Sequence, residues 1–220
     1  MAKLFDMDNP IWRFMGRVAD LFFLTVLWTA FSLPVFTVGA STTALYYVTL
    51  KMAENRAGYI FPSFWRAFRE NLGTSTLLWG ILLASGVFLG WDLYYCYRLG
   101  PGAGTVAFWL LAALSVLYVL MLTLVFPLAA RLAAGIKKLI FMTFMVCLKN
   151  ISWVILMAVL TVCAAAFGVF VFWPFLLFSA GAVAYIHSVI LARFIFPRYG
   201  WSDMEGTDRN GGEIISGKEG

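Results

Sequence analysis

Three ionisable side chains fall inside long apolar stretches, where a charge is costly and therefore marks a candidate functional residue. Asp20 follows Arg17 by three positions, a spacing that allows an ion pair on a helix near the membrane surface. Asp92 stands beside Trp91, where an aromatic belt with a hydrated carboxylate is expected. His187, the single histidine, lies in the last apolar stretch and suits either an interhelical hydrogen bond or proton transfer.

A group of polar side chains interrupts an apolar region at Gly39–Tyr47, which has the sequence GASTTALYY. The candidate cavity or partner-contact residues in it are Gly39, Ser41, Thr42, Thr43, Tyr46 and Tyr47. Hydroxyls at the start of a helix can cap its first backbone N–H groups, and we expect Ser41 or Thr42 to do so. The same hydroxyls and the two tyrosines could instead line a polar cavity and meet a sugar or a partner protein. Both interpretations stay open at this point.

No pattern typical of an enzyme accompanies these residues. The sequence has no Walker A loop, no HExxH pair and no Gly-x-Ser-x-Gly turn. One histidine and three scattered cysteines do not make the ligand set of a metal site. The sequence therefore predicts a protein that is not an enzyme and that has no catalytic residues, metal or cofactor.

The composition predicts the environment of these residues. The chain of 220 residues is 62% hydrophobic and 12% charged, with a mean hydropathy of +0.87. Soluble domains are about 45–50% apolar and about 25% charged. A bilayer-spanning helix needs about 20 apolar residues, and unpaired backbone groups are not tolerated in lipid. We predict an all-α membrane protein with six membrane segments, at about residues 18–36, 40–51, 75–97, 106–130, 151–171 and 174–196.

The distribution of Lys and Arg predicts the orientation, because short cytoplasmic loops are enriched in these residues. With six crossings and both termini in the cytoplasm, all but Arg98 of the 16 Lys and Arg residues fall on the cytoplasmic side. Membrane orientation and anionic membrane lipid explain the net charge of +5 without a nucleic-acid partner. Residues 1–198 are predicted to form one membrane domain. Residues 199–220 are polar and Gly-rich, and we expect a disordered cytoplasmic tail there.

The second predicted segment is too short to span a bilayer alone. Its dozen or so apolar residues before Lys51 cover about 18 Å, against a hydrocarbon core of about 30 Å. Pro34 and Gly39 break the preceding helix. We therefore expect a broken second helix, with a turn at 37–41 inside the outer half of the membrane. The backbone of that turn must be shielded by protein or line a wet cavity.

Two amphipathic helices are predicted on the cytoplasmic membrane surface. Residues 57–72 place aromatic side chains at helical spacing, with Arg66, Arg69 and Glu70 between them. The candidate surface-helix residues are Trp65, Arg66, Phe68, Arg69 and Asn71. Residues 131–150 occupy the equivalent place after the fourth segment, so the two halves could form an internal repeat.

Residues 17–71 resemble a known family. The shared features are an Arg-x-Ala-Asp start, a Ser-Leu-Pro turn, the GASTTALYY segment, and a later Gly-Tyr and Ser-Phe region. They comprise Arg17, Ala19, Asp20, Ser32, Leu33, Pro34, Gly39–Tyr47, Gly58, Tyr59, Ser63 and Phe64. This pattern resembles the YesL-like family of small bacterial membrane proteins. The resemblance implies a multi-pass protein of the bacterial cytoplasmic membrane, associated in Gram-positive bacteria with carbohydrate utilisation and importers of the ATP-binding-cassette (ABC) class. It carries over no catalytic or binding residues.

The resemblance and the surface helices together predict a non-catalytic accessory subunit of an oligosaccharide ABC importer. Such a subunit would pack against permease subunits, and from the cytoplasm against the permease or its ATPase, and would affect their assembly or gating. The broken second helix favours one alternative, a stand-alone small-solute transporter or channel. A second alternative is a membrane sensor or regulator of carbohydrate uptake that signals through the surface helices.

Overall fold

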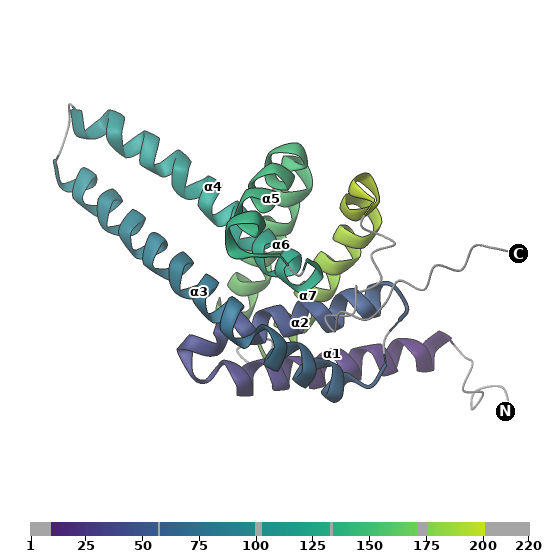
Figure 1. Ribbon diagram of the computed structural model, residues 1–220. Coiled ribbons are helices and arrows are strands. Elements are labelled where there is room, and N and C mark those ends of the chain that lie inside the picture. The colour runs from purple at the N-terminus through teal and green to yellow at the C-terminus, as the bar shows by residue number, and fades with distance from the viewer. Residues whose placement is uncertain (1–9, 57, 100–102, 133, 171–175, 201–220) are drawn as a thin grey trace, which may run out of the picture.

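The computed structural model describes residues 10–56, 58–99, 103–132, 134–170 and 176–200, and all regular elements in these ranges are helical. The helices are α1 (Pro10–Ser32), α2 (Val38–Ala53), α3 (Ile60–Leu99), α4 (Ala103–Arg131), α5 (Ile136–Lys149), α6 (Ile151–Phe170) and α7 (Leu176–Ile190) (Figure 1). The predicted all-α class is confirmed. The predicted tail lies outside the described residues from position 201 onwards.

Short non-α turns flank two of the helices. A 3₁₀ turn at Val35–Thr37 precedes α2. A π-helical turn at Leu191–Ile195 and a 3₁₀ turn at Phe196–Tyr199 extend α7. The last apolar segment therefore continues as a helical path up to Tyr199, the first residue of the predicted tail.

Five helical segments in the described ranges are long and apolar enough to cross a membrane. They are Met15–Ser32, Ile60–Arg98, Gly104–Arg131, Ile151–Phe170 and Ser179–Tyr199. These segments are consistent with a multi-pass membrane protein. The predicted second crossing is not among them, because α2 has only 16 residues, or about 24 Å of helix. The described residues thus contain five helical segments that could span a membrane, and the second predicted crossing is the short helix α2.

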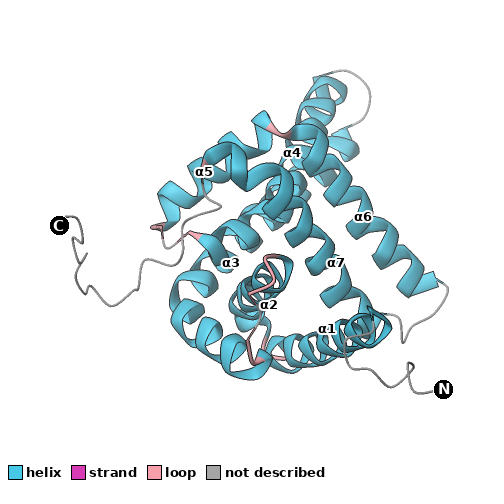
Figure 2. Ribbon diagram, turned by 90° about the vertical axis from the view of Figure 1, so that its right-hand side faces the viewer, coloured by secondary structure: helices cyan, strands magenta, loops and turns pink. Residues whose placement is uncertain are grey.

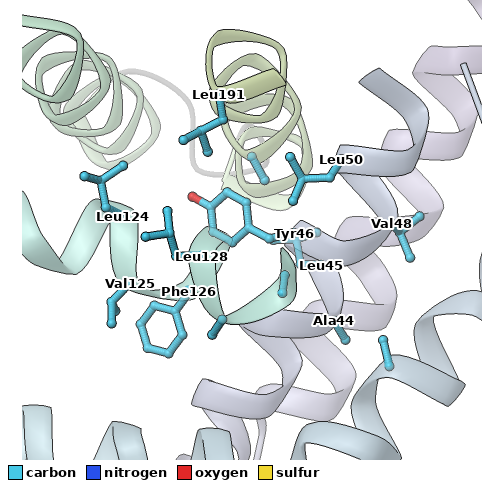
Figure 3. Close-up of a cluster of buried hydrophobic side chains, with 14 of the residues drawn as sticks. Ala44, Leu45, Tyr46, Val48, Leu50, Leu124, Val125, Phe126, Leu128 and Leu191 are labelled. Carbon is cyan, nitrogen blue, oxygen red and sulfur yellow. The ribbon is translucent and has the colours of Figure 1, made fainter. Parts of the chain in front are cut away.

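The short helix α2 lies in the centre of the molecule. In Figure 2 it is seen close to end-on, with α1, α3, α4 and α7 around it. Eleven of its 16 residues are buried. Its apolar side chains join a cluster with residues of α4 and of the π-helical turn, and Figure 3 labels Ala44, Leu45, Tyr46, Val48, Leu50, Leu124, Val125, Phe126, Leu128 and Leu191. Neighbouring helices therefore shield the backbone of α2, as a helix too short to span the membrane requires.

The turn before α2 differs from the prediction. The Pro34 carbonyl accepts the backbone N–H of Thr37 at 2.9 Å, and the Thr37 hydroxyl shares its one proton between the Phe31 and Pro34 carbonyl oxygens, each 2.7 Å away. This 3₁₀ turn leads directly into α2 at Val38, so the break lies at 33–37 rather than at 37–41.

The predicted capping role of Ser41 and Thr42 is also wrong. Because α2 starts at Val38, both residues lie within the helix rather than before it. The residue at the N-cap position is Thr37, which makes no capping hydrogen bond through its side chain. Ser41 instead donates back to the Val38 carbonyl at 3.2 Å.

Helix α3 joins two elements that were predicted separately. The surface helix at 57–72 and the third membrane segment at 75–97 form a single helix of 40 residues, about 60 Å long. Gly73 is the only strong helix-disfavouring residue between them, and one glycine weakens a helix without ending it. The apolar side chains Phe64 and Phe68 are buried and contact Phe31 of α1, with ring centroids 5.7 and 5.1 Å apart. Phe64 and Phe68, which the amphipathic pattern places toward the membrane, are thus covered by protein.

Candidate functional site

Two polar side chains of α2 bond to α1, the helix that precedes it in the chain. The Ser32 and Ser41 hydroxyl oxygens lie 2.5 Å apart. Trp28 donates its indole N–H to the Thr42 hydroxyl at 3.1 Å. Two of the candidate residues therefore link antiparallel helices on either side of the 3₁₀ turn.

Two further candidate residues face α3. The Thr43 hydroxyl donates to the Gly39 carbonyl at 2.9 Å and lies 3.0 Å from the Ser75 hydroxyl. Because Thr43 has already donated its one proton, Ser75 is the donor in this second bond. A Cβ at Gly39 would clash with the Ser75 carbonyl oxygen and would lie 2.6 Å from Cβ of Trp79. Gly39 thus allows a close helix crossing, and its expected role in a tight turn is wrong.

Tyr46 bonds to the only histidine of the chain. Its hydroxyl lies 3.1 Å from Nδ1 of His187 on α7, and the two rings are stacked with an interplanar angle of 7°. Nε2 of His187 lies 3.0 Å from the Met157 carbonyl oxygen on α6. A carbonyl can only accept, so Nε2 carries a proton, and in the neutral ring Nδ1 then accepts the tyrosine proton. Both ring nitrogens are thus bonded to other helices, and this supports the predicted interhelical hydrogen bond.

Small polar residues complete the contact surface of α7. The Thr49 and Ser188 hydroxyls are 2.8 Å apart between α2 and α7. The backbone N–H of Gly181 donates to the Thr25 hydroxyl of α1 at 3.0 Å. A Cβ at Gly181 would lie 2.6 Å from the Leu21 carbonyl oxygen. Close approach through small residues and hydroxyl bonds across the interface are the usual means by which helices associate in membranes.

The remaining candidates in apolar stretches lie nearer the surface. Arg17 donates to Oδ1 of Asn55 at 2.9 Å, and Asp20, with which an ion pair was predicted, is exposed. Asp92 is only partly buried, and its neighbour Trp91 is exposed. Tyr47 is partly buried and lies under the ammonium group of Lys51, which is 4.6 Å from the ring centroid.

The candidate residues of the first predicted surface helix divide between two faces of α3. Phe68 and Asn71 are buried, and Asn71 donates to the Ala67 carbonyl at 2.8 Å. Trp65 is exposed and lies under the Arg69 guanidinium, 5.9 Å away. The Arg66 Nε lies 2.9 Å from Oε1 of Glu70, in an ion pair open to solvent.

An ion pair that the sequence analysis missed joins the ends of α2 and α4. Arg131 Nη1 lies 2.8 Å from Oε1 of Glu54, and the two side chains are only 12% and 16% exposed. The Arg131 guanidinium also lies over the ring of Phe196, 5.5 Å from its centroid. In the sequence, both charged residues lie at the ends of apolar segments, which marks each as a candidate. No sequence pattern indicates that the two form a pair.

A pocket of about 370 Å³ opens between α3, the end of α4 and the start of α5. It is lined by Glu70, Asn71, Thr74, Ser75, Leu78, Ala129, Leu132, Ala134, Gly135 and Leu139. Its polar side chains come from two successive turns of α3, in and beside the run Asn71–Thr76, which is polar at four of its six positions. That run was the sequence signal for the pocket, and only its first residue was among the predicted candidates.

Comparisons with known proteins address the resemblance of residues 17–71. Residues 21–93 match the family described as "Protein of unknown function, DUF624". Over 206 residues the chain is 25% identical to the uncharacterized protein YesL of Bacillus subtilis (strain 168), covering 90% of this chain and 94% of YesL. No solved structure matches the chain. The two matches confirm the predicted resemblance of this chain to the YesL-like family.

Proposed function

We propose that this protein is a non-catalytic accessory membrane subunit of an oligosaccharide ABC importer. In this role it packs against the permease subunits within the membrane and affects their assembly or gating. The association with carbohydrate import comes from the family resemblance. The geometry distinguishes side chains that hold the fold together from side chains that are exposed and available to a partner.

The bonding of Tyr46 and its neighbours on α2 is the observation that carries the proposal. The polar side chains of this helix reach Ser32, Ser75, His187 and Ser188, all within the same chain. Hydroxyls engaged in this way stabilise a helical bundle, whereas a solute path needs polar groups that exchange partners with the solute. The central helix therefore fits a structural role better than a transport role.

The surface available to a permease lies on the hairpin of α3 and α4. Figure 1 shows these two helices running side by side away from the other elements. Their far halves carry many exposed apolar side chains, including Val87, Phe88, Trp91, Val106, Trp109 and Leu110. Within a membrane such a hairpin can lie against the helices of another subunit without rearrangement of α2.

Deletion of the gene in its native host tests the proposal. Uptake of labelled oligosaccharides and the amount of permease in the membrane should both fall, and expression of the wild-type chain should restore both. Unchanged uptake together with unchanged permease levels would refute the accessory role. Deletion of the permease provides the reference for complete loss of uptake.

A stand-alone transporter is a second candidate, favoured by the short helix α2 and by the pocket between α3, α4 and α5. Its distinguishing property is activity without other subunits. Purified protein reconstituted into liposomes should then move a sugar or an ion unaided. A panel of solutes with no flux above empty liposomes would exclude this candidate and leave the accessory role standing.

A further inference from the structure

We propose that the outer face of α5 binds anionic phospholipid and holds this helix along the membrane surface. That face consists of Lys137, Lys138, Phe141, Met145, Leu148 and Lys149. At 14 residues, or about 21 Å, α5 is too short to span a bilayer. It joins α4 to α6, which both contain segments long and apolar enough to span one. A helix between two such ends lies at the boundary between lipid and water. This inference is independent of the importer role.

Helix α5 has a buried face and an exposed apolar stripe. It packs chiefly against α4 and α6, and Figure 2 shows it at the edge of the bundle. The buried side chains are Leu139, Thr143, Val146 and Cys147. On the outer face, Phe141, Met145 and Leu148 are exposed, and their i, i+4, i+7 spacing places them in one stripe. The helix is therefore apolar on its outside as well as toward the protein.

Lysines border this stripe on both sides. With 3.6 residues per turn, Lys137 falls on one side of the stripe, and Lys138 and Lys149 fall on the other. All three side chains are exposed. Helix α5 contains no Asp or Glu that could neutralise them. The outer face thus combines three positive charges with an apolar centre.

Anionic phospholipid complements both parts of this face. An amphipathic helix with lysines beside an apolar stripe places the stripe among the upper acyl groups of a membrane. The lysine stems lie along the apolar surface while their ammonium groups reach the headgroups, where negative charge attracts them. A second copy of the same face would bring lysines opposite lysines, and such like-charge contacts are unfavourable. Lipid is therefore the occupant that the charge pattern favours.

The other predicted surface helix, now the first part of α3, is less suited to this role. Its Arg66 is ion-paired with Glu70, so this charge is already balanced within the chain. Its Phe64 and Phe68 are buried against Phe31 of α1. Of the two predicted surface helices, α5 therefore has the more complete lipid-binding face.

Native mass spectrometry of the full-length chain, delipidated in detergent micelles, tests the headgroup preference. The probes are phosphatidylglycerol and phosphatidylcholine with identical acyl chains, so only the headgroup charge differs. We expect phosphatidylglycerol to bind about tenfold more tightly, because each basic side chain near an anionic surface favours binding about fivefold. Equal affinity for the two lipids would overturn the proposal.

Two triple variants locate the binding. Lys137→Gln, Lys138→Gln and Lys149→Gln together should lower the affinity for phosphatidylglycerol to that for phosphatidylcholine. Arg at the same three positions keeps the charge and should keep the preference. Because the three side chains are exposed, both variants should fold, and size-exclusion chromatography and thermal unfolding check this. A Gln variant that is folded and keeps the preference of the parent would refute the assignment to α5.

A fluorescent probe on the apolar stripe distinguishes lipid from a second copy of the chain. Met145→Cys is labelled with bimane in a chain whose own cysteines, Cys96, Cys147 and Cys163, are replaced by Ala, and the protein is reconstituted into liposomes. Brominated phosphatidylglycerol should quench the probe more than brominated phosphatidylcholine, and salt should reduce the difference.

Two results of the quenching experiment would contradict the proposal. Equal quenching by the two brominated lipids would remove the headgroup preference. No quenching by either lipid would show that protein covers the stripe, and cross-linking of two labelled chains would identify a second copy there. The importer subunits are absent from these liposomes, so failure here leaves the accessory role untouched.

Discussion

The hydroxyl of Tyr46 lies 3.1 Å from Nδ1 of His187, although 141 positions separate the two residues in the chain. The same imidazole reaches the Met157 carbonyl through Nε2, at 3.0 Å. One histidine therefore connects α2, α6 and α7 in a region where all three side chains are buried. This contact explains why the central helix carries a tyrosine in the middle of an apolar cluster.

Replacing Tyr46 with Phe should destabilise the protein by about 1 kcal/mol, because Nδ1 of His187 loses its buried donor. The ring and its packing are retained, so the loss reports on the hydrogen bond. Unfolding in mixed micelles of mild detergent and SDS gives the free energy. Tyr47→Phe is the matched control, since the neighbouring ring lies under Lys51, and it should change stability little. Equal losses from the two substitutions would contradict the assigned bond.

Replacing Gly39 with Ala should be strongly destabilising. The added methyl group would overlap the Ser75 carbonyl oxygen and the Trp79 side chain, and backbone cannot move aside as a flexible side chain can. Gly80→Ala is the control, because a Cβ there has open space around it. That second variant should be neutral or stabilising by up to about 1 kcal/mol, from helix propensity alone. Thermal stability of the two purified variants, compared with the parent, checks the contrast.

The ion pair between Glu54 and Arg131 should contribute more than the pair between Arg66 and Glu70. Both have contacts of 2.8 to 2.9 Å, but only the first is largely shielded from solvent. Glu54→Gln should cost about 3 kcal/mol by leaving a poorly solvated guanidinium, whereas Arg66→Gln should cost less than about 1 kcal/mol. A double-mutant cycle on each pair provides the comparison. Similar coupling energies would show that burial of the first pair has no energetic effect.

Cysteine labelling should distinguish three environments. Cys147 is fully buried, and burial raises the pKa of its thiol above the ordinary value. The thiolate is the reactive form, so Cys147 should resist maleimide at pH 7 and stay resistant as the pH approaches 8.5. A membrane-impermeant maleimide added to intact cells should label Cys96, near the predicted outer end of α3. Cys163 lies exposed on α6, a helix long and apolar enough to span the membrane, and should react only with an apolar reagent.

The outcome for Cys96 also checks the predicted orientation. Labelling of Cys96 only in inverted vesicles would contradict cytoplasmic termini. Labelling of Cys147 in the folded protein would contradict the packing of α5 against its neighbours. Mass spectrometry of the three tryptic fragments identifies each site separately, and SDS-unfolded protein provides full labelling as the reference.

Apolar periodicity predicted most of the helices, because segment length and hydropathy are local properties. The shortness of α2 was predicted for the same reason, from the few residues between Pro34 and Lys51. The continuity of α3 through residues 72–75 was not predicted, because the change there from an amphipathic to an apolar pattern is typical of a helix boundary, whereas α3 continues through it. A change of environment along a helix leaves its backbone hydrogen bonds unaffected.

The partners of the polar residues could not be predicted from local pattern. Gly39, Tyr46 and His187 were all recognised as candidates, but the contacts that explain them join residues far apart in the chain. Glu54 and Arg131 illustrate the same limit, because either charge alone is typical of a membrane boundary. Only the arrangement of helices around α2 brings these side chains together.

Purification of the protein from its native membrane in mild detergent, with mass spectrometry of everything retained, tests the accessory role most directly. We expect permease subunits of an ABC importer in a fixed ratio to this chain, and their loss when exposed residues of the α3–α4 hairpin, such as Val87 and Trp109, are replaced by polar ones. A clean homo-oligomer that carries no other subunit, from cells in which the importer is abundant, would contradict it.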